Sequence, residues 1–494
     1  MYRRRITEQL KLEIPFGVEL RTDNRWVRLS ALMPWEKIEE RYAENFKGRN
    51  GQEALPGRLA FGALYIQARL TLTDEETVMQ IQENPAMQYF CGFDFYTPEK
   101  PFDSSLMVHF RKRITAEMMK EISEEAFAAE AKKAIEKEEE DDDNNGNAGT
   151  VNSGADGNEM DETSNKGTIL LDATCCPSDI HYPTDLGLLN HARELTEEMI
   201  DILWRTMPIY LRPEIKPRTY REVARRAYMS YTKKRRHASG ELRASIQQQL
   251  QYVRRNLDSI EKLKEQGADL GNLDNELYKK LFVISEVYRQ QKKMYDEKTN
   301  TVEDRIVSIA QPHLRPIVRG KAGSPVEFGA KVATAVIGGF SFVIHIAYDN
   351  FSEAKYLEAT VEEFKRMFGF YPKVIIGDRA YPTNDNRKYC KERGIRLSAP
   401  RRGRKSDEEI EAEKKQLYED SCLRNAVEAS YGVGKRKYGL GLIMTKLYDT
   451  TKTAISFGFF VKNMERVLRF FRFFILQIFL AFRCFENDNS DFAV

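Results

Sequence analysis

The sequence predicts an α/β protein: a mixed five-stranded sheet with helices on both faces, a helical hairpin inserted into that sheet, and an all-α N-terminal domain. Three observations indicate this architecture. Residues 1–135 carry apolar side chains at helical spacing from about residue 25 onward and contain no convincing strand. Residues 136–166 contain almost no large apolar side chain, so they predict an acidic, disordered linker and a domain boundary. Short apolar runs and helical stretches then alternate over residues 167–465.

The strands of the sheet are predicted from short apolar runs bounded by turn residues. In chain order they are residues 167–174 (GTILLDAT), the two halves of 326–350, 373–378 (KVIIGD) and 395–400 (IRLSAP). The middle pair is a hairpin that turns at Gly338–Gly339, and a helix over 357–368 follows it. The order strand, hairpin, helix, strand, helix, strand, helix is the ribonuclease-H-like plan, in which the first and fourth strands are neighbours.

A long helical segment separates the first strand from the hairpin. Apolar residues keep three/four spacing from Leu242 to Leu263 and again from Leu277 to Val287, and residues 267–272 (GADLGN) break the pattern. We therefore expect an antiparallel helical hairpin inserted at about residues 190–315. It is either a plain structural arm or an arm for dimerisation or DNA contact.

Charge is segregated along the chain, although 77 basic and 75 acidic residues leave a formal net charge of only +2. Acids concentrate in Glu136–Asp143, and bases cluster in Lys216–Arg236, Arg401–Lys405 and Lys435–Lys437. Locally basic surfaces suit a polyphosphate partner. The basic, aromatic-interleaved approach to the insertion therefore raises the DNA-contact alternative. The bases singled out there as DNA contacts are Arg225, Arg226, Lys233, Lys234, Arg235 and Arg236.

Three short helices are predicted near the end of the N-terminal domain, at residues 74–82, 85–90 and 104–114. Their layout suits a helix-turn-helix-like DNA reader, and an ordinary helical bundle is the alternative. The last of the three carries the candidate DNA contacts Arg111, Lys112 and Arg113.

Several other classes of protein are disfavoured by composition. The six cysteines lack CxxC spacing or a pairing with histidines, so zinc and disulfide sites are not expected. The N-terminus lacks the apolar core of a secretion signal, which favours a cytoplasmic protein. Residues 466–494 predict an apolar helix and tail whose run Phe473–Phe482 is well short of the roughly 20 residues of a membrane span. We expect a buried helix there and no membrane partner.

Two carboxylates follow the apolar runs of strands that should be neighbours, Asp172 in the first and Asp378 in the fourth. Acids at the carboxyl ends of adjacent strands project into the functional crevice of an open α/β sheet. Two anions placed together need a cation, so the pair predicts a metal site. Asp349 ends the third strand, which is not adjacent to the first, and is the weaker candidate.

A third candidate acid lies on a helix predicted over residues 421–437. At about 100° per residue, Arg424, Glu428 and Lys435 fall on one face of this helix. One acid and two bases suit phosphodiester chemistry, with Glu428 completing the metal site and the bases binding flanking phosphates. The alternative is a solvated face with an i,i+4 ion pair. Two glycines nearby weaken the helix around Lys435.

The spacing R-x3-E-x6-K at these three residues resembles the YREK signature of bacterial insertion-sequence transposases with a DDE catalytic domain. DRAY at 378–381 and LLDAT at 170–174 look like the segments around that family's two aspartates. The resemblance spans residues 167–465 or so and extends to the helical N-terminal part. Ser421 stands where the signature has its tyrosine, so the role of that tyrosine is not carried over.

The resemblance implies a DNA transposase in which Asp172, Asp378 and Glu428 hold two Mg²⁺ ions, with Mn²⁺ expected to substitute. The ions, roughly 3.5–4 Å apart, serve in-line phosphoryl displacement, and an all-carboxylate site suits Mg²⁺ better than zinc. Arg424, Lys435 and Arg379 are the DNA contacts expected beside the site.

The implied partners are double-stranded DNA, as terminal inverted repeats and as target, and a second copy of the chain in a homodimer that holds two ends. The implied location is the bacterial cytoplasm, with nucleoid association through DNA. Two alternatives remain, a metal-dependent nuclease of the same fold without strand transfer and a non-catalytic DNA-binding regulator.

Overall fold

A computed structural model describes residues 19–46, 53–144, 165–321, 324–400 and 406–490. The chain forms two compact units. The first comprises Met1–Pro177, Ala330–Ala347 and Phe351–Val494, and the second comprises Ser178–Gly329 and Tyr348–Asn350. The predicted basic cluster at 401–405 and most of the predicted linker, 145–164, lie outside the described residues.

The N-terminal region of the first unit is helical, as predicted. Its helices are α1 (Arg25–Leu32), α2 (Trp35–Ala43), α3 (Gly57–Leu70), α4 (Asp74–Glu83), α5 (Pro85–Phe90), α6 (Leu106–Arg113) and α7 (Ala116–Asn144). The helix starts are set locally. Thr73 caps α4 by accepting a hydrogen bond from the backbone N–H of Glu76, and Asn84 caps α5, whose first residue is Pro85.

Helix α7 corrects the predicted linker at its first residues. The acidic run from Glu136 was expected in a linker, but the helix continues to Asn144. The buried residues Phe127, Ala131 and Ile135 hold the middle of α7 in the core, so the acidic turns extend a helix that is already nucleated. The Glu139 carboxylate also accepts a hydrogen bond from the Gly167 N–H at 3.1 Å, which ties α7 to the entry of the first strand.

The sheet confirms the ribonuclease-H-like fold class. Its five core strands lie in the order β4-β3-β1-β5-β6, with β3 and β4 antiparallel and β1, β5 and β6 parallel. Their bounds are β1 (Thr168–Pro177), β3 (Ser324–Ile337), β4 (Phe340–Ala347), β5 (Val374–Ile376) and β6 (Arg396–Leu397). The structure adds a sixth strand, β2 (Pro316–Lys321), which pairs with the first residues of β3. The sequence did not predict β2, because its six residues begin with a proline and contain only a short apolar run.

The predicted hairpin turn between β3 and β4 is present at Gly338–Gly339. Both glycines have positive φ, +54° and +80°, as a tight two-residue hairpin loop requires. A side chain at Gly338 would also meet the backbone carbonyl oxygen of Ala131 in α7 at 2.9 Å. Glycine is therefore needed here for both conformation and space.

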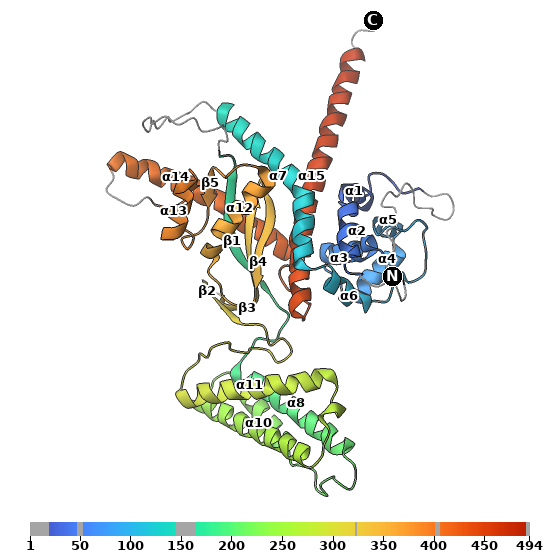
Figure 1. The fold of residues 1–494 in the computed structure, drawn as a ribbon, viewed down its shortest axis with the longest axis vertical. Helices are drawn as coiled ribbons and strands as arrows, with labels where there is room; N and C mark the ends of the chain where they lie inside the picture. Colours follow the sequence, from blue (N-terminus) through green and yellow to red (C-terminus); the bar gives the residue numbers. More distant parts are fainter. Residues whose placement is uncertain (1–18, 47–52, 145–164, 322–323, 401–405, 491–494) are drawn as a thin grey trace. The chain divides into compact units, whose positions relative to one another are not determined.

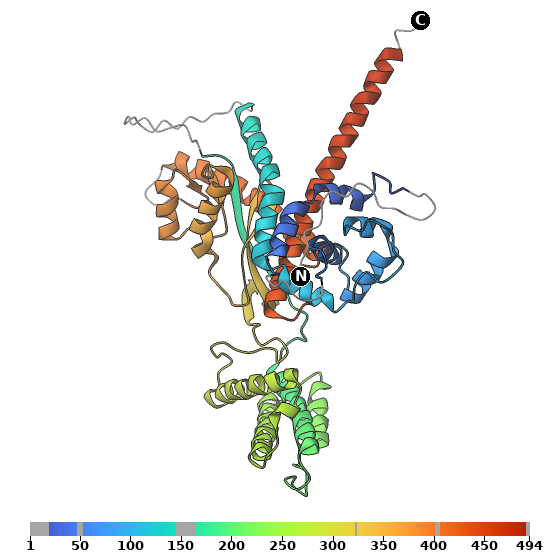
Figure 2. The ribbon, with the colours of Figure 1, turned by 45° about the vertical axis from the view of Figure 1, so that its right-hand side comes forward.

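Four further helices complete the first unit: α12 (Leu357–Phe368), α13 (Asn384–Glu392), α14 (Asp407–Lys437) and α15 (Tyr448–Ser490). Helices α7 and α15 pack side by side next to the sheet (Figures 1 and 2). Helix α15 runs through the predicted boundary at residue 466, so the C-terminal helix is its continuation. Among the described residues, no helix combines the length and apolar character that crossing a membrane requires.

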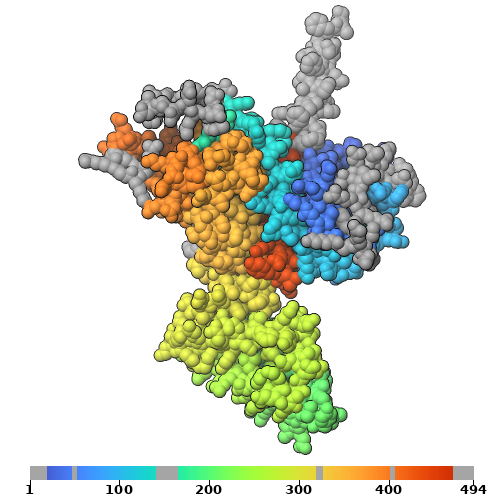
Figure 3. Space-filling view, in the orientation of Figure 1, coloured from blue at the N-terminus to red at the C-terminus, as the bar shows by residue number. Residues whose placement is uncertain are grey.

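A shared core joins the N-terminal helices to the sheet. Phe61 of α3 packs on Phe457 and Phe460 of α15, with ring centroids 4.9 and 5.4 Å apart, and Phe127 of α7 stacks on Phe340 of β4. The space-filling view shows these parts as one continuous surface (Figure 3). The N-terminal helices are thus part of the first unit. The domain boundary that was expected after residue 135 does not separate two folded bodies.

The second unit is mainly helical, with α8 (Asp185–Thr206), α9 (Arg221–Thr232), α10 (Glu241–Glu265) and α11 (Asn275–Glu297). Helices α10 and α11 are the predicted hairpin, and α8 packs along α10. This unit has its own apolar core, which includes Leu203, Val253 and Ile284. A buried ion pair between Arg193 and Glu197, 2.6 Å long, lies beside that core.

Candidate active site

Asp172 lies on β1, and Asp378 comes two residues after the end of β5, the parallel strand beside it. Strand β1 pairs with β5 in the register Thr168↔Val374 to Leu170↔Ile376. Asp172 and Asp378 each come two residues after the last pair of this ladder, Leu170↔Ile376, so the two chain segments reach the acids at equal distances past it. Asp172 does not end its strand as predicted, because β1 runs on to Pro177 alongside the 14-residue β3 after the three-residue β5 has ended.

Local contacts orient both carboxylates. Asp172 Oδ1 accepts a hydrogen bond from the N–H of Ala173, and Asp378 Oδ1 accepts one from the N–H of Ala380, each at 2.8 Å. The turn after Asp378 is held by Tyr381, which is 2% exposed and packs on Gly377 so closely that a Cβ there would lie 2.6 Å from the ring. A glycine before the aspartate is therefore a steric requirement.

Electrostatics show which groups surround Asp172. Burial raises the pKa of Asp172 to about 6, the hydrogen bond from Ala173 and the positive charge of Arg424 lower it, and the negative charges of Asp378 and Glu428 raise it. The two other candidate acids are thus close enough to act on Asp172. A cation placed among them would relieve the repulsion and favour the ionised carboxylate.

Glu428 reaches this region on α14, which packs against β1. The helix begins with a capping box between Ser406 and Glu409 and continues through both predicted weak points, Gly432 and Gly434, to Lys437. Gly434 is buried, and a Cβ there would lie 2.9 Å from Leu440, so close packing explains this glycine. Arg424, Glu428 and Lys435 are therefore on one helix, as expected.

The Glu428 carboxylate is exposed and forms an ion pair with a neighbour on its own helix. Its side chain is 61% exposed and pairs with Arg424 at 3.5 Å, which is the i,i+4 contact of the alternative reading. Within the described ranges, no three histidine, cysteine, aspartate or glutamate side chains lie close enough to hold a metal ion. The three carboxylates and their mutual repulsion fit a hard divalent cation chemically.

The other candidate DNA contacts divide into accessible and occupied groups. Arg379 is exposed and Lys435 is half-buried. In the second unit Lys234 forms an ion pair with Glu241, and the remaining five bases around α9 are exposed: Arg225, Arg226, Lys233, Arg235 and Arg236. Asp349 belongs to that second unit.

Arg111 requires a correction. We expected it to contact DNA, but its side chain is 7% exposed and binds both carboxylate oxygens of Asp74, at 2.8 and 2.6 Å, as well as Gln67. Arg113 lies over the Phe46 ring at 4.9 Å, and Lys112 is exposed. Because Asp74 is 37 residues away in sequence, the partner of Arg111 could not be seen in a local basic run.

Tyr431 is a residue of the site that sequence reasoning did not assign. It is buried on α14, three residues after Glu428, and its hydroxyl is 2.6 Å from the Thr334 hydroxyl of β3. Burial raises the pKa of Tyr431, and the negative charge of Asp172 raises it further. The sequence shows only a tyrosine near the signature, and Tyr418, the other one, is 72% exposed.

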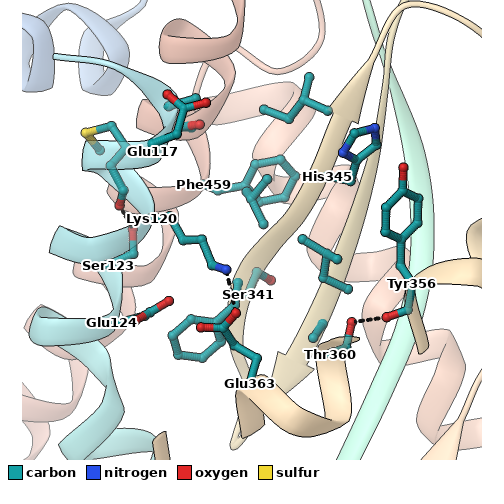
Figure 4. Close-up of a pocket in the computed structure, with 18 of the residues that line it drawn as sticks. Glu117, Lys120, Ser123, Glu124, Ser341, His345, Tyr356, Thr360, Glu363 and Phe459 are labelled. Atoms are coloured by element: carbon teal, nitrogen blue, oxygen red, sulfur yellow. Dashed lines mark hydrogen bonds and ion pairs between the residues drawn. The ribbon is translucent and has the colours of Figure 1, made fainter. Parts of the chain in front are cut away.

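A cavity of about 350 Å³ lies elsewhere in the first unit, between α7, β4, α12 and α15 (Figure 4). Lys120 of α7 reaches across it to Glu363 of α12 at 2.6 Å, and His345 of β4 stacks on Tyr356. None of the three candidate carboxylates lines this cavity. It is therefore distinct from the candidate active site.

Comparisons with known proteins agree with the resemblance seen in the sequence. Residues 375–465 match a family model described as "Transposase DDE domain", and residues 17–113 match one described as "Transposase domain (DUF772)". The chain is 38% identical over 96 residues to an uncharacterized protein, ORF8 in the nfe locus of Rhizobium meliloti. This match covers 19% of the chain and 46% of the relative, so the chain spans about half the length of that relative. No solved structure matches the chain.

The two family models confirm the resemblance to bacterial insertion-sequence DDE transposases. The first includes Asp378, Glu428 and Lys435, and it begins inside β5, after Asp172. The second covers α1 to α6.

Proposed function

We propose that this protein is a DNA transposase that binds the terminal inverted repeats of a mobile element and carries out Mg²⁺-dependent strand cleavage and strand transfer. The observation that carries the proposal is the parallel pairing of β1 with β5, whose last pair, Leu170↔Ile376, comes two residues before Asp172 and Asp378. Helix α14, with Glu428, packs against β1. Both matching family models describe transposase domains, one over residues 17–113 and the other over residues 375–465.

Asp172, Asp378 and Glu428 are the proposed ligands of the metal. Bound divalent ions would supply an activated water and charge stabilisation of the leaving 3′ oxygen. The raised pKa of Asp172 means that this carboxyl ionises fully only above about pH 6 unless a cation is near. The protein's part is to hold two aspartates rigidly on the sheet and to bring a third carboxylate from the helix.

Arg424 has two partners available in this arrangement. It pairs with Glu428 and its charge acts on Asp172, so it neutralises the acids in the absence of a metal. A DNA phosphate offers the guanidinium a stronger bidentate partner. We propose that DNA binding draws Arg424 onto a phosphate and leaves Glu428 free to turn toward the aspartates.

DNA contacts are proposed for three further surfaces. Arg379 and Lys435 lie beside the site, and the exposed bases around α9 would track the phosphate backbone. Residues 1–135 are proposed to recognise the element's ends, with Lys112 as the exposed base of α6. Holding two ends at once requires two active sites, so a homodimer is the proposed assembly.

The test uses purified full-length protein, a duplex carrying the element's end, Mg²⁺ and a labelled target plasmid. We expect a joined product from the wild type and from Asp349→Asn, a matched change of an exposed strand-end carboxylate. Asp172→Asn, Asp378→Asn and Glu428→Gln should abolish it. Nicking without joining by the wild type would instead identify a nuclease.

A second candidate is a DNA-binding regulator without catalysis. The ion pair between Arg424 and Glu428 favours it, because it occupies the carboxylate that would complete the metal site. In that case the wild type would bind the end duplex without cutting it, and Asp172→Asn would bind equally well. The same assay therefore separates the two candidates.

A further inference from the structure

Helix α14 touches the rest of the first unit through a narrow stripe. Its buried residues are Asp420, Val427, Tyr431 and Gly434. Two of these make polar contacts with the sheet: Asp420 binds Arg396 of β6 through two hydrogen bonds of 2.8 Å, and Tyr431 binds Thr334 of β3. Glu428 lies between these two contacts along the helix.

The contact of Tyr431 is well defined. The side chain is 7% exposed, its ring meets Phe459 of α15 edge-on with centroids 6.4 Å apart, and Thr334 is fully buried. Both hydroxyls are buried away from water, so removing either one leaves the other without a hydrogen-bond partner. The desolvation cost of such an unsatisfied hydroxyl strongly favours the conformation in which the two are bonded. The hydrogen bond therefore ties one side of α14 to one point on the sheet.

Such a tie matters because apolar packing does not by itself fix the rotation of a helix. Side-chain ends lie about 5–6 Å from a helix axis, so a 20° rotation moves a carboxylate by about 2 Å. Metal ligands tolerate only about 0.2 Å. Tyr431 is three residues from Glu428, less than one turn, so its directional hydrogen bond constrains the helix where accuracy is needed.

We propose that Tyr431 is a positioning residue: through its hydrogen bond to Thr334 it sets the rotation of α14, and so the position from which Glu428 joins Asp172 and Asp378. The proposal rests on the proposed metal site. It assigns to Tyr431 no contact with DNA or metal, and it makes Thr334 an equal partner.

The experiment measures Mn²⁺ binding to the full chain. Binding is detected as a loss of the electron paramagnetic resonance signal of the free ion. Tyr431→Phe and Thr334→Val each remove the hydrogen bond from one side. We expect each to weaken Mn²⁺ binding about fivefold, and the double variant to be no weaker than either single change, because the two share one interaction. If Tyr431→Phe is too unstable to study, Thr334→Val decides alone.

The matched control is Tyr389→Phe on α13, which removes a tyrosine hydroxyl that donates a hydrogen bond of 2.5 Å to Glu362 of α12. It should leave Mn²⁺ affinity unchanged even where it lowers the melting temperature. Equal weakening in this control, or unchanged affinity in both Tyr431→Phe and Thr334→Val, overturns the proposal. Wild-type Mn²⁺ binding that survives in Asp172→Asn would instead overturn the metal site itself, and with it the role of Tyr431.

Discussion

The strand-borne aspartates and the helix-borne glutamate are placed by different means. Backbone pairing of β1 with β5 fixes the chain two residues before Asp172 and Asp378, and a ladder cannot slip by one residue without turning every side chain to the other face. Glu428 depends on side-chain contacts of α14 at Asp420 and Tyr431. The sheet therefore supplies a rigid, half-buried part of the site, and the helix supplies an exposed, adjustable part.

The largest expected effect is on strand cleavage. Asp172→Asn and Asp378→Asn should each lower the cleavage rate by about a thousandfold or more, because metal ions supply several kcal/mol of transition-state stabilisation. The measurement is single-turnover cleavage of an end duplex at saturating protein. If either variant still cleaved within tenfold of the wild-type rate, the two aspartates would not form the essential, rigid part of the site.

A second prediction concerns the pH dependence of stability. The folded-state pKa of Asp172, about 6, lies above its ordinary value of 3.8. Such a carboxyl binds its proton more tightly in the folded protein than in the unfolded chain. Its contribution to the unfolding free energy is therefore complete below about pH 4 and is lost as the pH rises through 6. Between pH 4 and 7, the metal-free wild type should lose about 2–3 kcal/mol of unfolding free energy relative to Asp172→Asn.

Urea unfolding of both proteins at the two pH values measures this difference. Mg²⁺ should restore part of the loss at neutral pH. Parallel curves for the wild type and Asp172→Asn would show that Asp172 is not a strained carboxylate.

A third prediction tests how α14 is held. Arg396→Gln leaves the buried carboxylate of Asp420 without its bidentate partner, and since Arg396 is 38% exposed we expect a loss of about 1–2 kcal/mol in unfolding free energy. Arg387→Gln, a nearby change on α13, is the control. A loss below 0.5 kcal/mol would mean that the polar contact does not anchor the helix.

The smallest expected effect is the stability change in Glu428→Gln. Because the side chain is 61% exposed and its ion pair with Arg424 is at the surface, unfolding free energy should change by less than about 0.5 kcal/mol at any pH. Thermal unfolding at low and neutral pH checks this. A large stabilisation, like that expected for Asp172→Asn, would mean that the two parts of the site share one environment.

Prediction of the fold succeeded where a pattern reports on its own residues. Short apolar runs bounded by turn residues identified β1, β5 and β6, the glycine pair identified the β3–β4 turn, and helical spacing identified α10 and α11. The strand order then followed from general rules of chain connection. Strand β2 and the extension of α7 were missed, because neither has a distinctive local pattern.

Local patterns in the sequence predicted most of the helices and strands and the order of the five core strands, because burial period and turn residues act over short stretches of chain. The partner of each polar group depends instead on tertiary packing. Arg111 binds Asp74, 37 residues away, and Tyr431 binds Thr334, 97 residues away. Glu428 pairs with Arg424 because the end of a long, exposed side chain is placed by its neighbours, whereas Asp172 is placed by the backbone ladder of β1.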